Sequence, residues 1–206
     1  MKKKIKVAVL VSGGGTNLQA LIDAEKKGDL PSAEIALVVS NNSTAYALRR
    51  AEENGIKALT VTKKGTGGQE QMEDVISAAL DENGIELIVL AGFMSILSER
   101  FVRKYDHRIL NVHPSLIPSF CGKGFYGLKV HEAALEKGVK VTGATVHFVN
   151  EIPDGGEIIM QKAVNVLEDD TPETLQKRVM RQAEWKILPA AVEKTARKML
   201  AEGFEA

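Results

Sequence analysis

Residues 5–17 are IKVAVLVSGGGTN, and this stretch decides the fold class. Its first part, residues 5–11, is mostly apolar and rich in β-branched side chains, as in a parallel strand that is buried on both faces. A cluster of glycines follows, and a helical pattern of apolar residues then begins at Leu18 and continues at Leu21 and Ile22. The order of strand, glycine loop and helix is typical of an α/β protein.

The glycine loop at residues 12–17 brings backbone N–H groups together with a helix N-terminus, an arrangement that binds phosphate groups. The loop lacks the Gly-Lys-Ser/Thr of a Walker A motif, and Leu18 stands where the dinucleotide motif has its third glycine. A plain tight turn is the alternative, but we favour a phosphomonoester site. Its candidate residues are Gly13, Gly14, Gly15, Thr16 and Asn17.

The rest of the chain continues the alternation of strands and helices. We expect further strands at residues 35–39, 58–61, 87–90, 109–113, 139–149 and 158–166. The last two are close enough to form a hairpin, which makes that end of the sheet mixed. The sequence therefore predicts an open, mostly parallel, twisted sheet with helices on both faces, which is a Rossmann-like α/β fold. We expect Pro189 to kink or divide the last helix.

Composition limits the classes of partner. The chain of 206 residues predicts a single domain over residues 1–206, with a phosphate-binding half at about 1–105 and a catalytic half at about 106–206. The formal net charge of 0 gives nucleic acid or an anionic membrane no general attraction. No apolar run approaches the ~20 residues of a membrane span. The single cysteine, Cys121, excludes an internal disulfide and is typical of a reducing compartment, so we expect a cytoplasmic protein.

Polar residues that could perform chemistry lie at the ends of expected strands. Asn111 and His113 are two apart on one strand, so they point to the same face. An amide can donate to a developing oxyanion, and an imidazole can carry a proton near neutral pH. Asp154 precedes Gly155 in a turn, where a carboxylate usually has a structural role. Beside His113 it would instead orient the imidazole and raise its pKa.

Other candidates are weaker. His107 is expected to be exposed, His131 to lie on the surface or behind the site, and His147 to look into the cleft as a supporting group. Cys121 could pair with His113 as a nucleophile, although Lys123 is the only neighbour that would lower the thiol pKa. No spacing of His, Cys, Asp and Glu predicts a metal site.

A segment after the fourth strand is apolar although it leaves the carboxyl end of a sheet strand, where ligands bind in this fold class. It either lines a slot for a flat apolar ring or is core beneath a loop. Its residues are Phe93, Met94, Ser95, Ile96 and Leu97.

Four ordered motifs now carry a family resemblance. They are LVSGGGTNLQ at 10–19, LAGFM at 90–94, NVHPSLIP at 111–118, and GATVHFV at 143–149 leading to Asp154-Gly155-Gly156. From about residue 5 to about residue 195 the chain resembles the phosphoribosylglycinamide formyltransferases of purine synthesis, also called glycinamide ribonucleotide transformylases.

The resemblance implies transfer of the formyl group of 10-formyltetrahydrofolate, a co-substrate, to the amine of N1-(5-phosphoribosyl)glycinamide through a tetrahedral intermediate. It implies no metal, only small-molecule substrates, and a monomer or homodimer. It assigns catalysis to Asn111, His113 and Asp154, and folate binding to residues 93–97 together with Asn111. It adds Glu184 to the phosphoribosyl site.

Two positions depart from the family pattern. Ser95 stands where relatives often carry Arg, and Gln69 stands where they carry a basic residue, which Lys63 or Lys64 would replace. Related deformylases carry an extra N-terminal domain and methionyl-tRNA formyltransferases an extra C-terminal one, and we expect neither here. A deformylase-like hydrolase and a non-catalytic module that binds phosphorylated ligands are the alternative functions.

Overall fold

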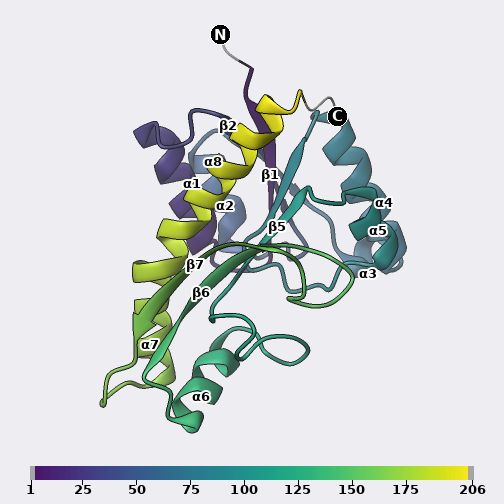
Figure 1. Cartoon of the computed structure of the whole chain (residues 1–206). Coiled ribbons are helices and arrows are strands. Elements are labelled where there is room, and N and C mark those ends of the chain that lie inside the picture. Colours follow the sequence, from purple (N-terminus) through teal and green to yellow (C-terminus); the bar gives the residue numbers. More distant parts are fainter. Residues whose placement is uncertain (1–2, 204–206) are drawn as a thin grey trace.

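Figure 1 shows the computed structural model, which describes residues 3–203. The expected domain range extends past this part, because residues 1–2 and 204–206 lie outside it. The sheet contains β1 (Ile5–Val11), β2 (Ala33–Ser40), β3 (Lys57–Thr60), β4 (Leu87–Leu90), β5 (Ile109–His113), β6 (Val141–Phe148) and β7 (Ile158–Asn165). The helices are α1 (Thr16–Lys27), α2 (Tyr46–Glu53), α3 (Lys63–Thr66), α4 (Gln69–Glu82), α5 (Glu99–Lys104), α6 (Leu128–Lys137), α7 (Pro172–Val179) and α8 (Trp185–Ala201), with a π-helical segment η1 (Met180–Glu184) before α8.

The strands form one sheet in the order β3-β2-β1-β4-β5-β6-β7. Pairs from β3 to β5 are parallel, and the pairs β5–β6 and β6–β7 are antiparallel. The prediction of a mostly parallel sheet that becomes mixed at its C-terminal end is therefore confirmed. The β5–β6 register sets Asn111 opposite His147 and His113 opposite Thr145, so both expected catalytic residues of β5 face β6 partners.

Both faces of the sheet are covered (Figure 1). Alternate residues of β1 enter two different cores: Val7 and Val9 pack with α1 and α8, whereas Ala8 and Leu10 pack with α4 and α5. All four are at most 1% exposed, which explains why β1 is apolar along its length rather than alternating. None of the helices in the described part is long and apolar enough to cross a membrane.

The glycine loop between β1 and α1 is held from behind by α2. The carbonyl of Gly13 accepts from the N–H of Ala47 at 3.1 Å, and that of Gly14 accepts from Nε of Arg50 at 2.9 Å. Gly15 is left-handed, with φ of 69°, immediately before α1 begins. Within residues 3–203, the N–H groups of Gly13, Gly14 and Gly15 donate to no protein acceptor. These donors are therefore available to an anion.

The last helical region departs from the sequence prediction. Thr171 caps α7 and Pro172 opens it, as expected, but α8 runs through Pro189 without division. The irregular turn is η1, which ends where the N–H of Trp185 donates to the carbonyl of Met180, five residues back. The carbonyl that Pro189 leaves without its helical N–H is that of Trp185. Trp185 directly follows η1, so the missing bond and the irregular winding lie at the same point of the helix.

Candidate active site

A cavity of about 590 Å³ opens at the carboxyl ends of β4 and β5. Its walls are the segment after β4, the end of β5, the loop at 122–127, the turn at 153–154, and the face of α7 and η1. Asn111, His113 and Asp154 all line it, so the structure brings the three expected catalytic residues together. A ligand in this cavity would contact segments from both halves of the chain.

Asn111 is oriented by two acceptors. Its Nδ2 lies 3.2 Å from Nε2 of His147 and 3.4 Å from Oδ1 of Asp154. Nδ1 of His147 lies 2.7 Å from the carbonyl of Phe148, which can only accept, so that nitrogen carries the hydrogen. In the tautomer that carries its single hydrogen on Nδ1, Nε2 of His147 accepts from Asn111. The expectation that His147 supports the site is consistent with this contact.

His113 is 4% exposed and both ring nitrogens face polar groups. Nε2 lies 2.9 Å from the carbonyl of Phe120 and must donate to it. Nδ1 lies 3.5 Å from Oδ2 of Asp154. That carboxylate oxygen also accepts a 2.8 Å hydrogen bond from the N–H of Gly122. The loop after β5 thus holds the imidazole and the carboxylate through its own backbone.

The protonation of His113 differs from the prediction. Burial lowers the pKa of His113, and this effect outweighs the opposing influence of Asp154 and of the Phe120 carbonyl. Asp154 therefore acts in the expected direction but does not make the imidazole cationic in the free protein. For Asp154, burial alone raises the pKa, but the contacts with His147, with His113 and with the Gly122 N–H together lower it. The pair is a neutral imidazole facing a carboxylate.

Asp154 reaches this position through an unusual backbone conformation. Its φ is 56°, in the left-handed region, which Asp tolerates better than most residues because its short side chain bonds locally. The residue lies in the connection between β6 and β7, beyond the strand that carries His147. Strain of this kind is often retained at functional sites. The turn that the sequence predicts thus also directs the Asp154 carboxylate into the cavity.

Asn17 and Glu184 form a second polar pair in the cavity. Nδ2 of Asn17 donates to Oε2 of Glu184 at 2.7 Å. Burial raises the pKa of Glu184 to about 7, and the Asn17 hydrogen bond only partly opposes this. Glu184 lies in η1, and π-helical turns occur frequently at functional sites. The two residues that the resemblance assigns to the phosphoribosyl site therefore touch each other.

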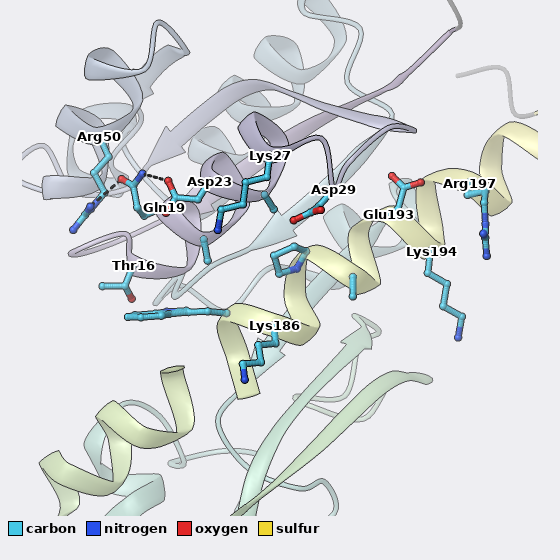
Figure 2. A pocket seen from close by; sticks show the side chains of 15 residues that line it. Thr16, Gln19, Asp23, Lys27, Asp29, Arg50, Lys186, Glu193, Lys194 and Arg197 are labelled. Atoms are coloured by element: carbon cyan, nitrogen blue, oxygen red, sulfur yellow. Dashed lines mark hydrogen bonds between the residues drawn. The ribbon is translucent and has the colours of Figure 1, made fainter. Parts of the chain in front are cut away.

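The glycines of the loop are not part of the cavity wall. Gly13 and Gly14 are exposed, and Asn17 is the member of the loop that lines the cavity. Thr16 instead lines a second cavity of about 780 Å³ between α1 and α8, with Trp185 on the opposite helix. Figure 2 shows this second cavity, where Arg50, Gln19 and Asp23 are linked by hydrogen bonds of 2.9 Å.

The expected folate segment is largely at the cavity. Phe93, Met94, Ser95 and Ile96 line it, and the apolar side chains of Met94 and Ile96 are 57% and 71% exposed. Exposed apolar side chains beside a cavity fit the flat apolar part of a ligand. Leu97 is different, because it packs against the core beneath α4 and does not line the cavity.

The two departures from the family pattern are tied into this segment. Oγ of Ser95 accepts from Nδ2 of Asn41 at 2.8 Å, and Nε2 of Gln69 donates to the carbonyl of Ile96 at 3.2 Å. Ser95 is therefore bound to the Asn41 side chain and Gln69 to the backbone of Ile96, and neither offers a charge. Neither Lys63 nor Lys64 lines the cavity; among the described residues, Lys123 is its one Lys or Arg.

Cys121 is a poor nucleophile in this setting. Its Sγ donates to the carbonyl of Pro118 at 3.3 Å. Burial and the charge of Asp154 both raise the pKa of the thiol, so it stays protonated at neutral pH. Within residues 3–203, no group of three or more His, Cys, Asp and Glu is placed to hold a metal ion.

Sequence reasoning missed several wall residues. His131 is fully buried and lines the cavity, so the expectation of a surface residue is wrong, whereas the alternative that it lies behind the site stays a prediction. Gln176 and Met180 line the same wall as Glu184. Their spacing of four residues places all three on one helical face, which was the available signal. The burial of His131 depends on how α6 packs and left no comparable pattern.

Comparisons with known proteins agree with this geometry. The formyl transferase family model matches residues 5–192. The chain is 42% identical to phosphoribosylglycinamide formyltransferase of Haemophilus influenzae, over 91% of this chain and 85% of that one. It is 49% identical to the trifunctional purine biosynthetic protein adenosine-3 of Gallus gallus over 94% of this chain, but it spans only 18% of that protein's length.

Solved structures agree as well. Glycinamide ribonucleotide transformylase 1 from Symbiobacterium toebii matches with a TM-score of 0.88 and 39% identity, over 95% of this chain and 89% of that one. Phosphoribosylglycinamide formyltransferase from Brucella melitensis matches with a TM-score of 0.86 and 44% identity, over 94% and 96% of the two chains. With the family model covering nearly the whole sequence and the expected residues gathered in one cavity, the chain belongs to the formyl transferase family.

Proposed function

We propose that this protein transfers the formyl group of 10-formyltetrahydrofolate to the amine of N1-(5-phosphoribosyl)glycinamide, in de novo purine synthesis. The products are formylglycinamide ribonucleotide and tetrahydrofolate. The observation that carries the proposal is the cluster of Asn111, His113 and Asp154 on the wall of one cavity, with Asn17 and Glu184 on the same wall. The names of the full-length relatives support the same reaction.

The acceptor substrate, the ribonucleotide, would lie along the wall that runs from the glycine loop to His113. Backbone N–H groups of Gly13, Gly14 and Gly15, with the dipole of α1, would hold its phosphate. Asn17 and Glu184 would contact its ribose. This arrangement would direct the substrate amine toward the Asp154 end of the cavity.

The formyl donor would occupy the side lined by residues 93–96, where Met94 and Ile96 offer exposed apolar surface. The donor supplies an activated formyl carbon. As the amine attacks this carbon, Asn111 would donate to the formyl oxygen as that oxygen gains negative charge. The amine would lose a proton to the His113–Asp154 pair, where Nδ1 and Oδ2 are 3.5 Å apart. The same pair would return a proton to the leaving nitrogen of the donor, so the imidazolium forms only during the reaction.

One assay tests the proposal. Protein is mixed with 10-formyltetrahydrofolate, with and without the ribonucleotide, and the appearance of tetrahydrofolate is followed. We expect release only when both substrates are present. Equal release without the ribonucleotide would favour the deformylase-like alternative. Folate binding without turnover in either mixture would favour a binding module.

We further propose one catalytic domain over residues 1–206, in which the half up to about 105 holds the phosphate and the rest supplies the catalytic residues. The single cysteine supports a cytoplasmic location. The zero net charge supports small-molecule partners rather than nucleic acid. Monomer and homodimer both remain compatible with the proposal, and no metal is assigned a role.

A further inference from the structure

His131 is a polar group without a partner in the interior of the protein. It lies on α6, is 0% exposed, and neither Nδ1 nor Nε2 has a hydrogen-bond partner within residues 3–203. A buried polar atom left without a partner destabilises a fold, and native proteins retain few of them. Nothing in the mechanism above uses this residue. Its retention therefore calls for a partner that is absent from the protein alone.

The location of His131 indicates what that partner is. The residue lines the active-site cavity, and it is close enough to His113 to interact with it electrostatically. Helix α6 packs against α7, which continues into η1 and carries the wall residues Gln176 and Glu184. The expected folate segment, residues 93–97, follows β4 and lies on the other side of β5 from the β6 edge of the sheet. His131 thus belongs to the stretch of wall between His113 and Glu184, where the acceptor substrate would lie.

The charge state of His131 limits the chemistry further. Burial lowers its pKa to about 4, and His113 adds to this. The imidazole is therefore neutral at pH 7 and offers one N–H donor and one acceptor nitrogen. Such a ring matches a hydroxyl or an amide, which also both donate and accept. It gives no net charge to a phosphate or carboxylate.

We propose that His131 is a substrate-binding residue that hydrogen-bonds the uncharged middle part of the acceptor substrate, its hydroxyl or amide groups. The inference rests on the function proposed above, and it adds a contact that fixes the substrate between the phosphate loop and His113. The ligand-free protein tolerates an unpaired imidazole because the substrate supplies the missing partners. Binding of an acceptor with matching hydroxyl or amide groups thus removes the destabilising effect of the unpaired nitrogens, and an acceptor without such groups does not.

Two substitutions test this inference. His131→Leu removes both hydrogen-bonding nitrogens, and His131→Gln keeps a donor and an acceptor. We expect His131→Leu to raise KM for the ribonucleotide by about 10- to 100-fold, the range for leaving substrate polar groups unpaired. KM for 10-formyltetrahydrofolate should stay within about twofold. His131→Gln should recover part of the loss. Glu132→Gln, at the exposed neighbour on α6, is the matched control and should change neither constant.

Thermal unfolding of the ligand-free protein separates binding from structure. Because the nitrogens of His131 have no partner there, His131→Leu should leave Tm unchanged or raise it. A lower Tm, a failure to fold, or an unchanged KM for the ribonucleotide would each overturn the inference. So would an equal rise in both KM values.

A direct measurement needs no turnover. The chain has four histidines, so the ring ¹⁵N resonances of His131 can be assigned by their loss in His131→Leu. Adding the ribonucleotide alone should shift them, because both nitrogens gain partners. If the ribonucleotide binds and these resonances stay in place, the inference is wrong although the proposed function stands. If the ribonucleotide does not bind the unaltered protein, the proposed function itself fails.

Discussion

Asn17 and Glu184 are 167 positions apart, yet Nδ2 of Asn17 donates a 2.7 Å hydrogen bond to Oε2 of Glu184. The contact joins the first turn of α1 to the end of η1 and buries the carboxyl group almost completely, at 6% exposure. A single neutral hydrogen-bond donor does not compensate for the desolvation of a carboxylate. The raised pKa of Glu184, about 7, is the consequence.

The first prediction concerns stability against pH. The folded-state pKa of about 7 lies above the reference value of 4.5, so the folded protein holds this proton more tightly than the unfolded chain. The stability it provides is fully present below pH 4.5 and is lost as pH rises through about 7. Glu184→Gln should therefore match the unaltered protein at pH 4.5 and be more stable at pH 8, by about 3 kcal/mol.

Denaturant titrations of both proteins across this pH range check the prediction. The difference between the two curves isolates Glu184, since all other titrating groups are shared. Glu136→Gln, at an exposed position on α6, should give no such pH-dependent difference. A stability difference that is the same at both pH values would show that Glu184 is already ionised when buried.

Gly15 carries the second prediction. A Cβ there would lie 2.6 Å from Cβ of Ala47 and 2.8 Å from its Cα, and the glycine is left-handed. Gly15→Ala should move the loop away from α2 and raise KM for the ribonucleotide by about tenfold or more, through lost hydrogen bonds to the phosphate. KM for the folate should not change.

Gly28→Ala is a matched control for Gly15→Ala. Gly28 ends α1, is also left-handed with φ of 83°, and has open space where a Cβ would be. The control should lose about 1 kcal/mol of stability and keep both KM values. If Gly15→Ala also leaves the ribonucleotide KM unchanged, the phosphate binds elsewhere.

The third prediction uses substitutions at His113 and Cys121 to distinguish catalysis by the histidine from catalysis by a thiol nucleophile. His113→Asn should lower kcat by about 100- to 1,000-fold, because the site loses a group that carries charge in the transition state. Cys121→Ser should leave kcat within about twofold, since the thiol is protonated and bonded to the Pro118 carbonyl. Steady-state kinetics at saturating substrates decide between them. The opposite pattern would restore the thiol nucleophile.

Local features of the sequence were sufficient for most of the fold. The strand at 5–11 and the glycine loop after it are contiguous, so their order alone predicts a parallel sheet. Asn111 and His113 are neighbours on one strand, and the period of two places them together. Pro189 shows the limit of local reasoning, because α8 continues through this proline and the irregular turn lies earlier, at η1.

The site was predictable where motifs carried it and unpredictable where burial decides. Glu184 was found only through the resemblance, and Asp154 was given a role only on the condition that it lies beside His113, since nothing local ties these residues to His113 or Asn17. The lowered pKa of His113 arises from how many atoms surround it, and a sequence does not give that number. The lack of hydrogen-bond partners at both ring nitrogens of His131 also follows from the packing of surrounding atoms. Leu97 packs against the core and not the cavity, and the sequence did not predict this because an apolar segment can face either one.

Asp154→Asn carries the last prediction. Asn also tolerates the left-handed conformation of residue 154, where φ is 56°, so the turn and its hydrogen bond from Gly122 should persist. The charge is removed, and the oxygen that accepts from Nδ2 of Asn111 becomes an amide NH2, which can instead donate to Nε2 of His147. Calorimetry should therefore show nearly unchanged affinity for both substrates, whereas kcat should fall by about 100- to 10,000-fold because the proton acceptor is lost.

The pH profile of this variant gives a second test with a definite sign. Asp154 raises the pKa of His113 against the larger effect of burial, so removing the carboxylate lets that pKa fall further. If the acidic limb of kcat/KM reports loss of neutral His113, the limb should move to lower pH in Asp154→Asn. Near-normal kcat with an unmoved limb would make Asp154 a turn residue only, and the proton would then leave the amine through water.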